Sequence, residues 1–76
     1  MMKIPPELIE TLAAVVAEGT FDAAARALHV TPSAVSQRIK ALENRIGRVL
    51  VVRSKPVVAT EAGEAAVQRY RAVREA

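Results

Sequence analysis

Two helix starts lie close together in the middle of the chain. Thr20 precedes an alanine-rich stretch, and Thr31-Pro32 follows eleven residues after Thr20. Threonine is a favoured N-cap because its hydroxyl accepts a hydrogen bond from the backbone of the first turn, and proline suits the first helical position. Only His29-Val30 separate the first predicted helix from the cap of the second. This spacing predicts a helix-turn-helix, in which Ala25 lies where the two helices cross.

The composition favours helices around a core of small side chains. The 76 residues include fifteen alanines and eleven valines, but one Phe, one Tyr and no Trp. Alanine, leucine, glutamate and arginine are good helix formers. A chain of this length forms one small domain, and the absence of cysteine excludes disulfides and thiolate metal sites. We therefore expect a mainly α fold held together by packing.

Further helices are predicted on both sides of the motif. The first begins at Pro5-Pro6 and ends at Gly19, because glycine readily adopts the left-handed conformation found just past many helices. Its apolar stripe consists of Leu8, Leu12, Val15 and Val16. The last helix follows the N-cap Thr60 and spans about 24 Å. The apolar edge of this helix comprises Ala62, Ala66, Tyr70 and Val73. So small a domain cannot bury the whole edge. Its far end could pack back on the same domain or on a second copy of the chain.

The helix predicted at residues 32–46 has two opposite faces. At about 100° per residue, its apolar side chains gather roughly opposite Ser33. These apolar residues are Val35, Ile39, Leu42 and Ile46. The polar residues on the other face are Ser33, Ser36, Gln37, Lys40 and Asn44. One face is therefore expected to be buried, and the other to present hydrogen-bonding groups without any acid.

Residues 49–60 change character. Two valine-rich runs, 49–52 and 57–58, flank the segment Arg53-Ser54-Lys55-Pro56. Such a pattern predicts a two-stranded hairpin with a basic tip. Two strands are marginal alone, so the hairpin must lean on the helices. A hairpin directly after the second helix of the motif predicts a winged helix-turn-helix.

The positive charge is concentrated in one part of the chain. Residues 31–56 carry six basic side chains against Glu43 alone, a net charge of +5, whereas residues 1–30 carry −2. A basic block of this kind can attract a polyanion, although charged helix faces are often simply solvated.

The pattern fits double-stranded DNA. The major groove admits one helix, and the side chains near its N-terminus must be polar and free of acids. Gln37 could bind adenine through two hydrogen bonds. The predicted base-contacting residues are Pro32, Ser33, Ser36 and Gln37. The residues predicted on the DNA backbone or in the minor groove are Thr31, Arg38, Lys40, Arg53 and Lys55.

Other classes of protein fit less well. An enzyme needs convergent titratable groups, and the chain has one histidine, His29, without partners at metal-ligand spacing. We expect no catalytic residue, metal or cofactor. The longest run without charge, between Arg26 and Arg38, is too short to span a membrane, and no secretory signal opens the chain. The expected location is the cytoplasm.

Two binding functions remain as alternatives. A winged helix can serve as a protein–protein adaptor, because fold alone does not settle function. The discriminating property is salt dependence, since DNA binding through several phosphates weakens steeply as salt rises. An RNA-binding module is disfavoured because the sequence offers no aromatic platform for stacking bases.

A family resemblance rests on residues spread over the chain. They are Gly19-Thr20-Phe21, Ala24-Ala25, Leu28-His29-Val30-Thr31, Ser33-Ala34-Val35-Ser36-Gln37-Arg38-Ile39, Leu42-Glu43, Ile46-Gly47, Leu50, Arg53 and Thr60-Glu61-Ala62-Gly63. With this spacing, residues 4–76 resemble the N-terminal domain of LysR-type transcriptional regulators. The resemblance implies a bacterial, nucleoid-associated regulator that binds a dyad-symmetric DNA operator.

The resemblance also implies a domain organisation. Residues 1–59 would form the winged helix-turn-helix, with the helix at 32–46 in the major groove and the wing at 53–56 on the backbone or in the minor groove. Residues 60–76 would form a linker helix that pairs antiparallel with its mate in a homodimer, through Ala62, Ala66, Tyr70 and Val73. A separate C-terminal domain, absent from this chain, would sense a small-molecule effector.

Two departures from the common family pattern indicate a subgroup. Gln37 and then Arg38 follow the serine of the recognition helix, where many members have arginine first, and the wing is one residue shorter. Both features resemble the regulators of lysine or arginine export, also described as inhibitors of chromosome initiation. That resemblance places the sensing of basic amino acids in the absent domain.

Overall fold

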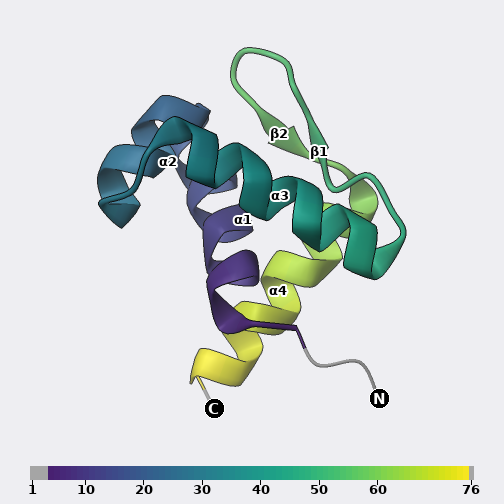
Figure 1. Ribbon diagram of the computed structural model, residues 1–76. Coiled ribbons are helices and arrows are strands. Elements are labelled where there is room, and N and C mark those ends of the chain that lie inside the picture. Colours follow the sequence, from purple (N-terminus) through teal and green to yellow (C-terminus); the bar gives the residue numbers. More distant parts are fainter. Residues whose placement is uncertain (1–3, 76) are drawn as a thin grey trace.

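The computed structural model describes residues 4–75 and shows four helices and a two-stranded antiparallel sheet (Figure 1). The elements are α1 (Pro6–Glu18), α2 (Phe21–Leu28), α3 (Pro32–Ile46), β1 (Val51–Val52), β2 (Val58–Ala59) and α4 (Glu61–Glu75). The mainly α, winged fold class is thereby confirmed. The outer ends of the two predicted domains, residues 1–3 and 76, lie outside the described residues.

Helix caps place the motif as the sequence predicts. The hydroxyl oxygen of Thr20 accepts from the Ala23 N–H at 3.0 Å, and that of Thr31 accepts from the Ala34 N–H at 3.1 Å. The turn between α2 and α3 passes through His29, whose φ of 60° is left-handed. Glycine fits that conformation more easily than histidine does. The Val30 N–H then donates to the Ala25 carbonyl and closes the turn.

One core joins the four helices and the wing. The buried apolar residues are Leu8, Leu12, Val15, Ala24, Ala25, Val35, Ile39, Leu42, Leu50, Val51, Val57 and Val67. Most of the predicted stripe residues are among them. Two large apolar residues of α2, Phe21 and Leu28, are only half-buried. Both stand at the ends of this short helix, where fewer neighbours can cover them.

The strands of the wing do not coincide with the full valine-rich runs at 49–52 and 57–58. Val51 pairs with Ala59 and Val52 with Val58, so Val49 is not part of a strand and is 66% exposed. The predicted two-stranded hairpin is present, and its first strand begins at Val51. The physical reason is a side-chain contact, because the Thr60 hydroxyl donates to the Val49 carbonyl at 2.7 Å and takes the place of a strand partner.

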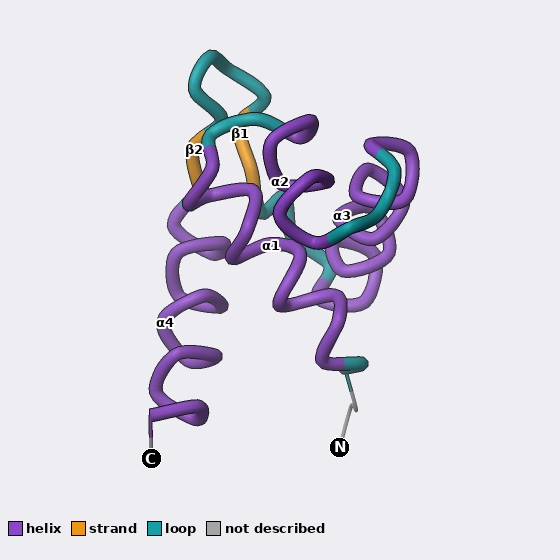
Figure 2. Tube along the Cα trace, turned by 90° about the vertical axis from the view of Figure 1, so that its left-hand side faces the viewer, coloured by secondary structure: helices purple, strands orange, loops and turns teal. Residues whose placement is uncertain are grey.

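Helix α4 begins inside the same core and then runs along α1 (Figure 2). Thr60 is its N-cap, accepting from the Gly63 N–H at 3.1 Å. Gly63 is buried against the backbone of Leu50, and Val67 is 1% exposed. The division of the chain after residue 59 stays a prediction, and the first turns of α4 belong to the packed body.

Candidate nucleic-acid interface

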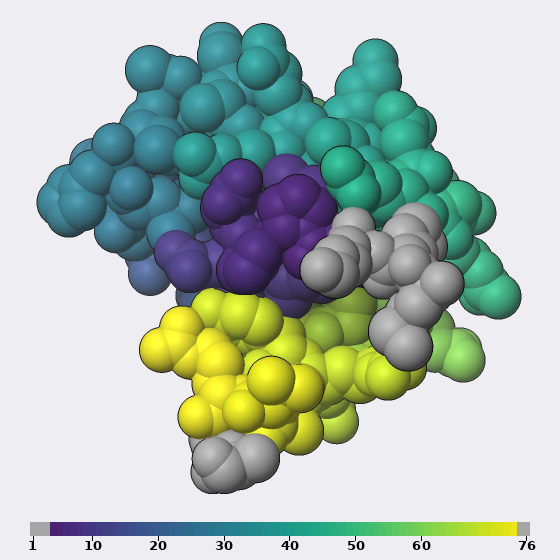
Figure 3. All heavy atoms as spheres, turned by 60° about the horizontal axis from the view of Figure 1, so that its bottom comes forward, coloured from purple at the N-terminus to yellow at the C-terminus, as the bar shows by residue number. Residues whose placement is uncertain are grey.

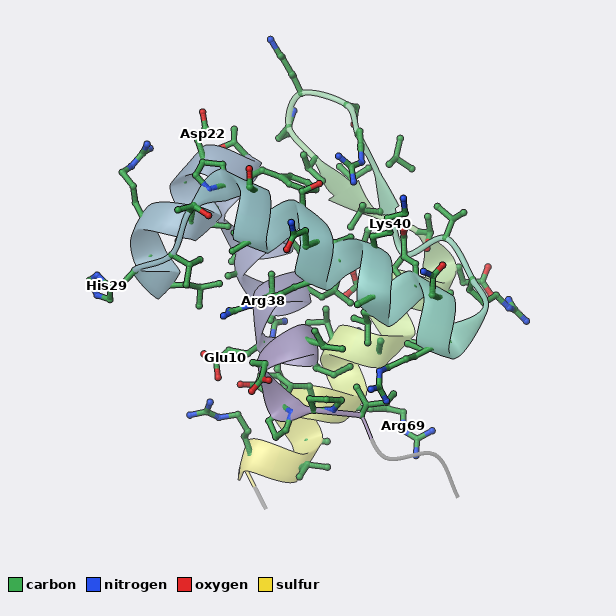
Figure 4. All side chains as sticks on the ribbon, in the orientation of Figure 1. Glu10, Asp22, His29, Arg38, Lys40 and Arg69 are labelled. Atoms are coloured by element: carbon green, nitrogen blue, oxygen red, sulfur yellow. The ribbon has the colours of Figure 1, made fainter. Side chains whose placement is uncertain are left out.

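The polar face of α3 lies on the outside of the molecule (Figure 4). Thr31, Pro32, Ser33, Gln37 and Lys40 are exposed, and Ser36 is half-buried. The opposite face of the helix supplies Val35, Ile39 and Leu42 to the core, each with no exposed surface. The structure thus brings all four predicted base-contacting residues together on one helical surface.

The single acid of the basic block is turned away from solvent. Glu43 is half-buried, and its Oε2 accepts from the Leu50 N–H at 2.8 Å. A charge-assisted bond of this kind is stronger than a neutral one. Glu43 therefore fastens the entrance of the wing to α3, and its charge is compensated by a backbone donor. No local sequence pattern predicts this contact, because it joins α3 to the segment that leads into the wing.

Backbone hydrogen bonds fix the base of the wing on the helices. The Val57 N–H, directly before β2, donates to the Gly19 carbonyl at 2.8 Å, which ties this arm of the wing to the turn between α1 and α2. On the other side, the Thr60 N–H donates to the Leu50 carbonyl at 3.0 Å. The tip of the hairpin, with Arg53 and Lys55, projects into solvent.

Arg53 is held by an aromatic ring. Its Cζ lies 4.6 Å from the centroid of the Phe21 ring, at the start of α2. A guanidinium over an aromatic face is attracted by the ring's quadrupole. This contact was not predicted from the sequence, because Phe21 and Arg53 lie 32 residues apart on different parts of the fold.

Arg38 does not share the polar face of α3. Its Nη1 donates to Oγ1 of Thr11 on α1 at 3.5 Å, and Thr11 is fully buried and donates in turn to the Glu7 carbonyl at 2.6 Å. In Figure 4, Arg38 extends toward α1, on the side where Glu10 lies. The structure separates it from the other predicted DNA contacts, and its assignment to the DNA backbone stays a prediction.

The four residues predicted for dimerisation line one groove between α1 and α4. Ala62 and Ala66 are half-buried and pack against the core, Tyr70 is half-buried, and Val73 is 77% exposed. Figure 3 shows α4 lying against the start of α1 on this side of the molecule. At the open end, Arg74 Nη1 donates to Tyr70 Oη at 2.8 Å, and this bond raises the pKa of the Arg74 guanidinium.

Two negative findings concern residues 4–75. No group of His, Cys, Asp or Glu side chains is arranged to hold a metal ion within that range. None of the helices found there has the length and apolar character needed to cross a membrane.

The fold and the site define the class of protein. A helix-turn-helix with an exposed, acid-free polar face, followed by a basic hairpin, is a winged helix-turn-helix module. The chain belongs to the lysR family of bacterial regulatory helix-turn-helix proteins, whose family model matches residues 6–64.

Known relatives place the chain more closely within that family. It is 58% identical over 66 residues to the lysine export transcriptional regulatory protein LysG of Corynebacterium efficiens, covering 87% of this chain and 23% of the relative. Full-length LysG from Corynebacterium glutamicum superposes with a TM-score of 0.89 at 51% identity, over 93% of this chain and 25% of that one. A second structure of that protein contains bound effector Arg.

A DNA complex is also among the similar structures. The CbnR DNA-binding domain in complex with DNA matches with a TM-score of 0.88 at 32% identity, over 95% of this chain and 84% of that one. The chain spans about a quarter of the length of the full-length regulators and most of the isolated DNA-binding domain.

Proposed function

We propose that the chain is the sequence-specific, double-stranded DNA-binding unit of a LysR-type transcriptional regulator. The observation that carries this proposal is the outer face of α3, which exposes Ser33, Gln37 and Lys40 while its only acid, Glu43, is bonded to the wing. A helix with side chains is about 10–12 Å wide, and the major groove is about 12 Å wide. The N-terminal half of α3 can therefore reach base edges.

The division of labour between the elements follows from their chemistry. Pro32, Ser33, Ser36 and Gln37 would read bases, because short polar side chains and an amide can meet base edges closely. Thr31, Lys40, Arg53 and Lys55 would bind phosphates or the minor groove and set the register. Arg38 is proposed to bind the DNA backbone from the side of α3, where its guanidinium also contacts Thr11.

We further propose that the unit acts as a homodimer through α4. The groove between α1 and α4 is lined by apolar side chains, and Val73 is mostly exposed, so a second copy could cover it. Two copies related by a twofold axis require a dyad-symmetric operator, with half-sites about 34–36 Å apart or a multiple of that distance.

The remaining proposals concern the whole protein. The similarity to LysG supports control of basic amino-acid export, with the effector bound by a domain outside this chain. A regulator of this kind would work in the cytoplasm on the nucleoid. We propose no enzymatic activity and no cofactor for the present chain.

The proposal is tested by selecting bound duplexes from a random pool with the purified chain, at about 50 and 200 mM salt. We expect an enriched dyad-symmetric motif. If six or more phosphates are contacted, the affinity should fall by about 10³-fold or more between the two salt concentrations. Binding without enrichment would contradict sequence-specific recognition by this chain. No binding at low salt would favour the protein–protein adaptor instead.

Arg53→Ala should weaken binding to the selected duplex and to an unrelated duplex by similar factors. The reason is that a phosphate contact carries no sequence information. The slope of log affinity against log salt should become less steep by about 0.9, the change expected for one phosphate. Fluorescence anisotropy titrations at several salt concentrations measure both quantities. A loss confined to the selected duplex would assign Arg53 to base readout.

A further inference from the structure

The contact between Arg53 and Phe21 joins the wing to the helix-turn-helix. Arg53 is exposed at the hairpin tip, yet its Cζ lies 4.6 Å from the ring centroid of Phe21. Lys55 is exposed on the same tip. Attraction between a guanidinium and an aromatic face restricts the arginine to fewer orientations than a flexible surface side chain has.

Both partners of this contact sit on backbone that is fixed by other bonds. Phe21 is half-buried, packs against the core and follows the N-cap Thr20, whose side chain is bonded to Ala23. The wing is fixed to the same turn, because the Val57 N–H donates to the Gly19 carbonyl at 2.8 Å. The position of the guanidinium is therefore defined from both sides.

A surface groove lies between this turn and the wing. Its charged and aromatic lining consists of Phe21, Asp22, Arg26, Arg53 and Lys55. Three cations against the one acid, Asp22, make the groove attractive to an anion. The groove lies at the junction of the wing with α2, so an anion bound there would touch both.

We propose that Phe21 is a positioning residue for DNA binding. Its ring holds the Arg53 guanidinium beside the first turn of α2, so that the wing and the helix-turn-helix bind one phosphodiester of the DNA backbone together. The ring acts through Arg53. Restricting a side chain before binding reduces the entropy that is lost on binding, and so increases affinity without a new contact. This inference rests on the proposed function.

The test compares Phe21→Leu, which keeps an apolar side chain without a ring, with Phe21→Trp, which keeps the aromatic face. Affinities are measured for the selected duplex and for an unrelated duplex of the same length. Phe21→Leu should weaken binding to both by about 2- to 5-fold, the range expected from an exposed cation–π contact. Phe21→Trp should bind within about 2-fold of the parent chain.

A double-substitution cycle separates positioning from a general effect on the fold. In the Arg53→Ala background, Phe21→Leu should cause no further loss of affinity, because the ring then has no guanidinium to hold. Thermal unfolding curves identify a temperature at which all variants remain folded. The binding affinities are compared at that temperature. In the free chain, the ring current of Phe21 should shift the Arg53 Hε resonance in the NMR spectrum. In Phe21→Leu that resonance should return to the chemical shift of an ordinary exposed arginine.

The outcomes distinguish this inference from the proposed function. Losses that multiply in the double variant, or a tryptophan variant as weak as the leucine variant, would overturn the positioning role while leaving DNA binding intact. Failure of the parent chain to bind any duplex would overturn the proposed function and the inference with it.

Discussion

Replacing Gly63 with alanine should destabilise the domain by about 2 kcal/mol or more. A Cβ at this position would overlap the carbonyl oxygen of Leu50 and lie 2.9 Å from its carbonyl carbon. Both are backbone atoms, so no side-chain rotation relieves the overlap, and α4 must move away from the start of the wing. The expected loss is large for a domain of this size, whose total stability is roughly 4–11 kcal/mol. Urea denaturation followed by circular dichroism measures it.

In an uncrowded helix, replacing glycine with alanine stabilises the protein by about 1 kcal/mol. A loss of stability in Gly63→Ala would therefore indicate crowding at this position. Gly47→Ala is a suitable control. Gly47 has a φ of 77° and no atom within 4 Å of an added Cβ, so its substitution costs only backbone strain, about 1–2 kcal/mol. If Gly63→Ala were no worse than Gly47→Ala, the close approach of α4 to Leu50 would not explain the glycine.

Gln37→Ala should remove base preference at one or two positions of the operator half-site. The expected loss is roughly 1–3 kcal/mol for the selected duplex, with little change for an unrelated duplex. The reason is that an amide can donate and accept at the edge of one adenine, whereas a methyl group cannot. Repeating the duplex selection with the variant shows which positions lose their preference, and anisotropy titrations give the affinities.

Asn44→Ala provides a matched control for Gln37. Asn44 carries the same amide on the same polar stripe and is also exposed, but it lies about two turns further along α3. Substitution there should leave the selected motif unchanged, because the N-terminal part of the helix enters the groove. Equal effects at the two positions would contradict this placement of α3. Equal behaviour of Gln37→Ala and Arg53→Ala would contradict the separation of base readout from backbone binding.

Local signals explain why most of the helices could be predicted. Thr20, Thr31 and Thr60 each bond to a backbone N–H three residues further on, so the cap and its partner lie in one short stretch of sequence. Gly19 and Gly47 end their helices in the left-handed conformation for an equally local reason. The two faces of α3 follow from helical periodicity alone.

The contacts that complete the site join different segments of the fold, and no local sequence pattern predicts them. Glu43 bonds to Leu50 rather than facing solvent, and Phe21 holds Arg53 from another element. Arg38 lies on α3, but its contact with Thr11 depends on how α3 crosses α1. The point at which the first strand begins also depends on such a contact, since the Thr60 hydroxyl donates to the Val49 carbonyl.

By itself, the sequence determined the helix limits, the turn between α2 and α3, the exposed polar face of α3, the basic hairpin and the family resemblance. Each depends on residues within a few positions of one another, or on spacing along the chain. Only the tertiary structure decided that Gly63 must lack a side chain, that Glu43 fastens the wing, and that Phe21 meets Arg53. These features depend on the distances between packed elements, which are fixed when the core closes around residues such as Leu50.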